Sequence, residues 1–138
     1  MSCVFFYGLF MDSDLLSEMG LRPVSLGPAL LRGYELRIGD RATLVPKAGA
    51  VAYGMLIELA DAELASLYSA PGVDGYRPYN VETERLDDGT AQPAVYYNLP
   101  ADKLGAEFNS EYAKTLSALL LRLGFPSNYA SEVNQPDL

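Results

Sequence analysis

The chain has 138 residues, 49% of them hydrophobic, and a formal net charge of −8. A chain of this length buries about two thirds of the surface that its unfolded form exposes, which is enough for one hydrophobic core. We therefore expect a single domain over residues 1–138. The acidic charge argues against nucleic-acid and anionic-membrane partners, since both require clustered lysine and arginine.

The scarce residue types limit the chemistry further. Because the sequence has no histidine and one cysteine, it lacks the usual zinc sites and every Ser-His or Cys-His catalytic pair. We expect no metal and no cofactor. Cys3 lies in a predicted strand, where a small buried hydrophobe is the expected role. No apolar stretch reaches about 18 residues and no signal peptide is evident, so we expect a cytoplasmic protein.

The start of the chain predicts a strand, a glycine turn and a helix. Residues 3–7 are rich in aromatic and branched side chains, and Gly8 ends this strand. Residues 12–14 offer N-caps for a helix over residues 14–19. A glycine turn that opens a helix lets backbone N–H groups converge into a cradle for an anion. The alternative is that Gly8 only permits a tight turn.

The rest of the chain predicts mainly strands. They span residues 29–38, 43–45, 51–59, 79–86 and 94–99, with turns at 47–49 and 87–89. Residues 110–123 carry apolar side chains at helical spacing, among them Tyr112, and Gly124 and Pro126 end this helix. Six strands with few helices indicate an α/β (α+β) fold, a small mixed barrel-like sheet flanked by helices.

Several motifs, in this order over almost the full length, resemble the gamma-glutamylcyclotransferase-like family. The first is Tyr7-Gly8-Leu9-Phe10, at the end of the first strand. Residues 39–46 and the strand 51–59 are similar to the second motif of the family, a strand that ends in proline, a hairpin and a further strand. Residues 61–73 are similar to its short helix. Gly75-Tyr76-Arg77 and residues 123–129 are similar to the last two motifs. The resemblance implies the barrel-like fold of that family.

The resemblance also implies an activity. In the family, the free α-amine of a gamma-glutamyl group attacks its own side-chain amide, which yields 5-oxoproline and a released amine in glutathione-related metabolism. One carboxylate with a raised pKa moves both protons, and no cofactor takes part. The substrate-binding residues that the motifs imply here are Tyr7, Gly8, Leu9, Phe10, Tyr76 and Tyr129. Tyr53, Tyr96 and Tyr97 lie in strands, where packing explains them.

Two departures from the family pattern fall in the same expected pocket. The position of the family glutamate falls on Pro71, or on Ala70 if the register slips by one, and neither side chain can move a proton. The serine or threonine of the first loop is replaced by Leu9. We therefore expect a protein that kept the pocket and lost or relocated the catalysis.

Three other carboxylates are candidates for a relocated base. Asp74 is near the vacant position, although an aspartate before a glycine is usually a turn former. Glu82 and Glu84 share one face of a strand, and they form a catalytic pair only if this face points into the barrel. Asp61 and Glu63 are explained by helix capping. Arg41 suits either a ligand carboxylate or a structural salt bridge.

Two hypotheses follow. The first is a binding protein for a gamma-glutamyl or similar amino-acid-derived small molecule, with weak or no turnover. The second is an active enzyme that releases 5-oxoproline with a relocated carboxylate. A fold resemblance alone does not decide between them, and the sequence leaves a homo-oligomer open.

Overall fold

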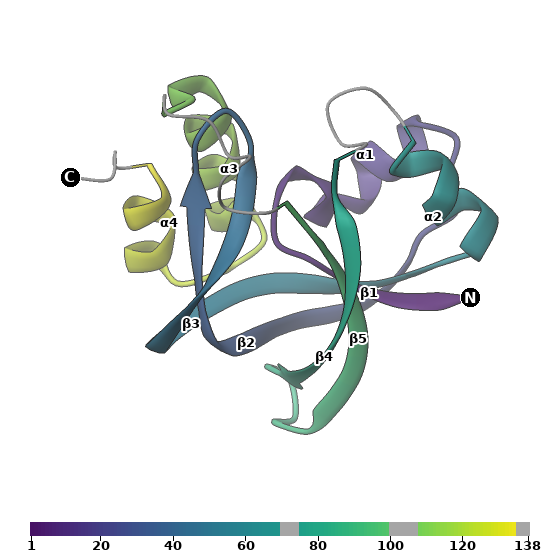
Figure 1. Cartoon of the computed structure of the whole chain (residues 1–138), viewed down its shortest axis with the longest axis horizontal. Coiled ribbons are helices and arrows are strands. Elements are labelled where there is room, and N and C mark those ends of the chain that lie inside the picture. Colours follow the sequence, from purple (N-terminus) through teal and green to yellow (C-terminus); the bar gives the residue numbers. More distant parts are fainter. Residues whose placement is uncertain (70–74, 100–107, 135–138) are drawn as a thin grey trace.

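A computed structural model describes residues 1–69, 75–99 and 108–134 (Figure 1). The elements, in chain order, are β1 (Ser2–Phe6), the 3-10 turn η1 (Leu9–Met11), α1 (Ser13–Glu18), β2 (Val24–Ile38), β3 (Ala42–Leu59), α2 (Asp61–Leu67), β4 (Arg77–Arg85), β5 (Ala91–Asn98), α3 (Ser110–Arg122) and α4 (Ser127–Val133). The strands form a closed barrel in the order β1-β3-β2-β4-β5. The paired strands are antiparallel except β1 and β5, which are parallel.

The mixed barrel flanked by helices confirms the predicted fold class, but the number of strands differs. The predicted strands 43–45 and 51–59 are parts of one strand, β3, because Pro46 still pairs with Tyr34 of β2. The turn predicted at 47–49 is therefore wrong. A register shift between Arg32 and Tyr34 and a positive φ of 81° at Gly49 let the long hairpin bend without breaking. The helix α4 was not predicted either.

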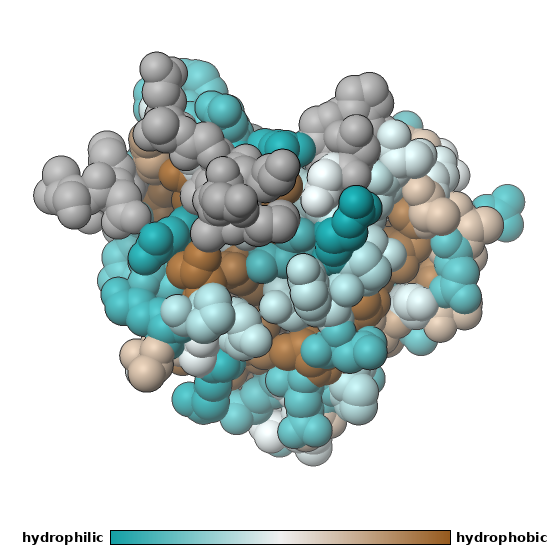
Figure 2. Space-filling view, viewed as in Figure 1, coloured by the Kyte–Doolittle hydropathy of each residue, from teal (hydrophilic) through white to brown (hydrophobic). Residues whose placement is uncertain are grey.

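The strand β1 separates two hydrophobic clusters. Its alternating side chains send Val4 and Phe6 toward the helices and Phe5 and Tyr7 into the barrel. The first cluster includes Leu16 of α1, Leu64 and Leu67 of α2 and Leu116 and Leu120 of α3. On the face seen in Figure 2, hydrophilic residues surround smaller areas of hydrophobic surface. None of the helices in the described part of the chain is long and apolar enough to cross a membrane.

The side chain of Asn98 connects the end of β5 to β3. Its Nδ2 donates to the Leu44 carbonyl at 2.8 Å, and its Oδ1 accepts from the Leu44 N–H at 2.8 Å. The Thr43 hydroxyl lies 2.8 Å from the same oxygen, and the Tyr7 hydroxyl lies 3.0 Å from it. The amide thus makes the two hydrogen bonds that a neighbouring strand would make to Leu44, and it also reaches the end of β1.

We predict that Asn98→Ala lowers the free energy of unfolding by about 2–4 kcal/mol, because it leaves buried polar groups of Leu44 without partners. The matched control is Asn80→Ala, since Asn80 lies exposed on β4. A surface change of this kind costs within about 0.5 kcal/mol. Urea unfolding measures both. Equal stability of the two variants would show that the Asn98 amide does not hold the strands together.

Candidate functional site

A cavity of about 300 Å³ lies where the ends of several elements meet. Its lining comes from the end of β1 and the η1 turn, the start of β3, the residue after α2, the residue before β4, the end of β5 and the first turn of α3. The lining residues are Phe5, Phe6, Tyr7, Gly8, Leu9, Phe10, Arg41, Ala42, Tyr68, Tyr76, Tyr97 and Tyr112. The structure thus brings together five of the six expected substrate-binding residues, Tyr7, Gly8, Leu9, Phe10 and Tyr76.

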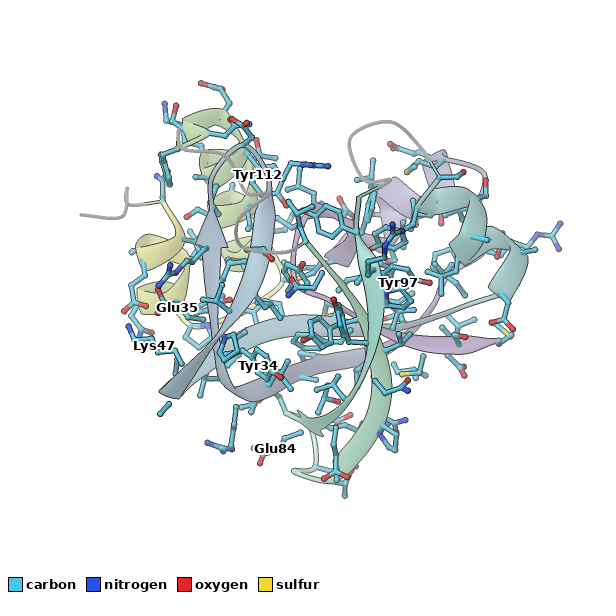
Figure 3. All side chains as sticks on the ribbon, viewed as in Figure 1. Tyr34, Glu35, Lys47, Glu84, Tyr97 and Tyr112 are labelled. Atoms are coloured by element: carbon cyan, nitrogen blue, oxygen red, sulfur yellow. The ribbon has the colours of Figure 1, made fainter. Side chains whose placement is uncertain are left out.

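Aromatic rings form most of the wall. Tyr68 stacks on Tyr97 with 3.9 Å between ring centroids and 7° between ring planes. Phe10 meets Tyr68 edge-on at 6.0 Å, and Tyr76 lies 6.1 Å from Tyr68. Figure 3 shows Tyr97 on β5 and Tyr112 on α3. Such a wall suits the apolar part of a small ligand, while the hydroxyl groups supply directed polar contacts.

Burial keeps these phenols protonated. It raises the pKa of Tyr7 and Tyr68 well above the usual value for tyrosine, and neighbouring tyrosines raise both further. Burial raises the pKa of Tyr76 to about 12, although the charge of Arg41 and a hydrogen bond with the Ala42 backbone act in the opposite direction. A neutral phenol is a hydrogen-bond donor and a weak base. These side chains are therefore equipped to bind and orient a ligand rather than to take its proton.

Arg41 brings a positive charge to the cavity lining. Its guanidinium carbon lies 5.6 Å from the centroid of the Tyr76 ring, which is within the range of a cation–π contact. The Tyr76 hydroxyl donates to the carbonyl of Ala42, the residue next to Arg41. Arg41 and Tyr76 thus belong to one corner of the cavity, where Arg41 supplies the positive charge and the Tyr76 hydroxyl is held by the Ala42 carbonyl.

Tyr129 does not join this cavity, contrary to the expectation. It is 7% exposed and packs edge-on against Tyr53 at 4.8 Å. It lines a second cavity, of about 560 Å³, between the β2–β3 hairpin and α4. The reason is that the chain after Pro126 turns into α4, which places residue 129 on the helix face that packs on β3. The expected convergence of Tyr129 with Gly8 is therefore wrong.

The candidate carboxylates of β4 lie outside the cavity. Glu82 is exposed, and Glu84 forms an ion pair with Arg32 at 3.1 Å. Thr83, between them, is buried and hydrogen-bonds the Gln92 carbonyl, so the alternation of β4 sends both glutamates outward. Glu63 accepts a hydrogen bond from the Arg22 N–H at 3.0 Å, which is a structural contact.

The positions Ala70, Pro71 and Asp74 lie outside the described residues. Among the described residues, no carboxylate lines the cavity, and no cluster of cysteine and carboxylate groups is arranged to hold a metal ion. Sequence reasoning missed three lining tyrosines, Tyr68, Tyr97 and Tyr112, because each also fits a packing role in its strand or helix. Their only signal was the high tyrosine content, ten residues in 138.

The comparisons with known proteins agree with this fold. A solved structure named gamma-glutamyl cyclotransferase has a TM-score of 0.76 at 17% identity, over 99% of this chain and 89% of that one. The structure of an uncharacterized human protein, loc79017, has a TM-score of 0.73 at 19% identity, over 99% of this chain and 89% of that one. The structure of YkqA from Bacillus subtilis has a TM-score of 0.76 at 22% identity, over 96% of this chain and 52% of that one.

At these identities the structural likeness establishes the fold alone. The comparison with curated proteins gives no significant match. The model of the family described as "Gamma-glutamyl cyclotransferase, AIG2-like" matches residues 4–114, which run from within β1 to the start of α3. The chain therefore belongs to the gamma-glutamyl cyclotransferase, AIG2-like family.

Proposed function

We propose that this protein binds a small gamma-glutamyl or similar amino-acid-derived ligand in the tyrosine-lined cavity and turns it over weakly or not at all. The observation that carries the proposal is the composition of the described lining, which holds many phenols and Arg41 but no carboxylate. Family membership supports the ligand class, since the family name refers to gamma-glutamyl groups.

The reaction of the family name requires a group that accepts and returns a proton. An ammonium must lose a proton before its nitrogen attacks a carbonyl, and the departing nitrogen must gain one. Phenols with a raised pKa hold their protons at neutral pH, and an arginine side chain does not lose its proton in proteins. The described lining therefore supplies binding and orientation, but no general base.

The lining also indicates how such a ligand sits. The positive charge of Arg41, in the corner that it shares with Tyr76, suits a carboxylate of the ligand. The stacked rings of Tyr68 and Tyr97 suit its apolar part. The loop of Gly8, Leu9 and Phe10 then faces the remaining polar groups of the ligand, as the sequence motif predicts.

The alternative is an active enzyme that releases 5-oxoproline with a relocated base. Because Glu82 and Glu84 face outward on β4, this alternative depends on Asp74. The observation that favours Asp74 is its position in the sequence, two residues before Tyr76, which lines the cavity.

The two functions differ in a measurable rate. We predict that the unmodified protein releases 5-oxoproline from a gamma-glutamyl amine about 10²–10⁴ times more slowly than relatives that carry the family glutamate, since general acid–base catalysis is worth that much. Pro71→Glu and Ala70→Glu, made separately, should raise the rate in the variant with the correct register. Ser69→Glu is the matched control, because it adds the same charge one position earlier.

Chromatographic detection of 5-oxoproline measures all four proteins. A rate for the unmodified protein comparable to that of its glutamate-bearing relatives would rule out the binding function. Asp74→Asn would then test the alternative, since loss of turnover in this variant identifies the relocated base.

The raised pKa of Tyr76 predicts a pH dependence of stability. The folded-state pKa of about 12 exceeds the value of 10.0 for an unperturbed tyrosine, so folding favours the protonated phenol. The resulting stabilisation is complete below pH 10 and is lost as the pH rises toward 12. We expect Tyr76→Phe to reduce the loss of stability over this interval in urea unfolding. Tyr79→Phe, at an exposed tyrosine of the strand β4 that follows Tyr76, is the control. Identical pH slopes in the two variants would contradict the assignment.

A further inference from the structure

The second cavity has the size of a small-molecule site and is separate from the first. Its volume of about 560 Å³ falls within the range of ligand pockets, and it lies between the β2–β3 hairpin and α4. None of its lining residues belongs to the tyrosine-lined cavity. A ligand held here would therefore contact no residue to which the proposed function assigns a role.

Two elements supply most of the polar side chains of this cavity. The alternation of β2 places Glu35 and Arg37 on the face opposite to Leu36, which packs against the hydrophobic clusters. On α4, Asn128 and Glu132 are four residues apart and therefore share one face of the helix. The cavity thus lies between a strand face and a helix face that carry charges of both signs.

Glu35 already has a partner in the cavity wall. Its Oε2 lies 2.9 Å from the Lys47 ammonium, and Figure 3 shows the two residues together on the hairpin. Its Oε1 lies 3.8 Å from Nε of Arg37, which is within the range of an ion pair but too long for a hydrogen bond. With respect to the described residues, the half-exposed guanidinium of Arg37 donates no hydrogen bond, so its planar set of N–H groups is open to a ligand.

Glu132 lines the same cavity without a partner of its own. It is exposed on α4, and no cation in the described part of the chain, Arg37 included, forms an ion pair with it. Arg37 and Glu132 thus bring opposite charges to one cavity without pairing with each other. A molecule that carries both charges can satisfy both side chains at once, whereas a molecule with one charge leaves one of them unpaired.

The apolar part of the lining completes the site. Tyr53 packs edge-on against Tyr129 with 4.8 Å between the ring centroids, so the aromatic wall is fixed by contacts within the fold. Val51 and Val133 also line the cavity, from β3 and α4. Side chains of this kind suit an apolar group of a ligand whose charged groups reach Arg37 and Glu132.

We propose that this cavity is a second binding site, for a small zwitterion of the α-amino acid class with an apolar side chain. The carboxylate of the ligand pairs with the guanidinium of Arg37, whose planar fork matches a carboxylate. The ammonium of the ligand pairs with Glu132, and its side chain packs on Tyr53 and the two valines. This inference does not rest on the proposed function, because the two cavities share no lining residue.

The test uses L-leucine as the probe and follows the backbone amide signals of the ¹⁵N-labelled protein by NMR. We expect the signals of α4 and of the β2–β3 hairpin to shift as leucine binds. L-Leucinamide lacks the carboxylate and 4-methylpentanoate lacks the ammonium. Each should bind about tenfold more weakly than leucine, the low end of the worth of a hydrogen bond to a charged group, since both protein side chains are partly exposed.

Two variants assign each ligand charge to its residue. Arg37→Gln should weaken leucine binding about tenfold yet leave leucinamide binding unchanged, because leucinamide has no carboxylate to lose a partner. Glu132→Gln should weaken leucine binding to a similar degree and leave 4-methylpentanoate binding unchanged. Arg22→Gln, at an exposed arginine outside both cavities, is the matched control. All three positions are exposed, so the variants are expected to fold.

The outcomes separate this inference from the proposed function. Absence of shifts in α4 and the hairpin, or equal binding of all three probes, overturns the inference. Shifts confined to the Gly8 loop would assign leucine to the tyrosine-lined cavity and overturn it as well. An equal loss for leucine and leucinamide in Arg37→Gln also contradicts it, because the effect would not depend on the ligand carboxylate. Failure of gamma-glutamylethylamide to bind, by contrast, overturns the proposed function and leaves this inference standing.

Discussion

The side-chain amide of Asn98 is the contact on which the rest of the structure depends. It binds both backbone groups of Leu44 and lies 3.0 Å from the Tyr7 hydroxyl, so three strands meet at one amide. The Tyr7 hydroxyl also lies 2.8 Å from the Tyr97 carbonyl. Tyr7 precedes the Gly8 loop, and Tyr97 forms a wall of the cavity. The same contact that links β5 to β3 therefore sets the distance across the candidate site.

Closure of the barrel also determines the chemistry that the cavity can offer. Phenols that lie on or next to four different elements become buried together, and burial raises the pKa of each of Tyr7, Tyr68, Tyr76 and Tyr112. A phenol with a raised pKa keeps its proton at neutral pH and therefore does not act as a base. The same burial that stabilises the fold thus keeps these phenols protonated, which is the premise of the proposed binding function.

Part of this arrangement could be predicted from local patterns. The strand 3–7, the turn at Gly8 and the apolar face of α3 follow from the spacing of hydrophobic residues and from the conformational freedom of glycine. The order of the motifs along the chain was enough to predict the family. The outward placement of Glu82 and Glu84 is the one expected of solvated charges on a strand. The continuity of β3 was not predictable, because local turn signals at 47–49 compete with pairing to β2, which is a long-range interaction.

The sequence by itself determined the family, the mixed barrel class, the Tyr-Gly loop and the absence of histidine chemistry, since these depend on residue identity and local spacing. Only the tertiary structure decided which tyrosines meet. Tyr112 and Gly8 are far apart in the chain, and their contact exists because α3 packs against β1 and the β2–β3 turn. Tyr129 matched a motif, yet α4 directs it toward Tyr53 and a different cavity. Side-chain convergence depends on the packing of whole elements, which residue spacing does not encode.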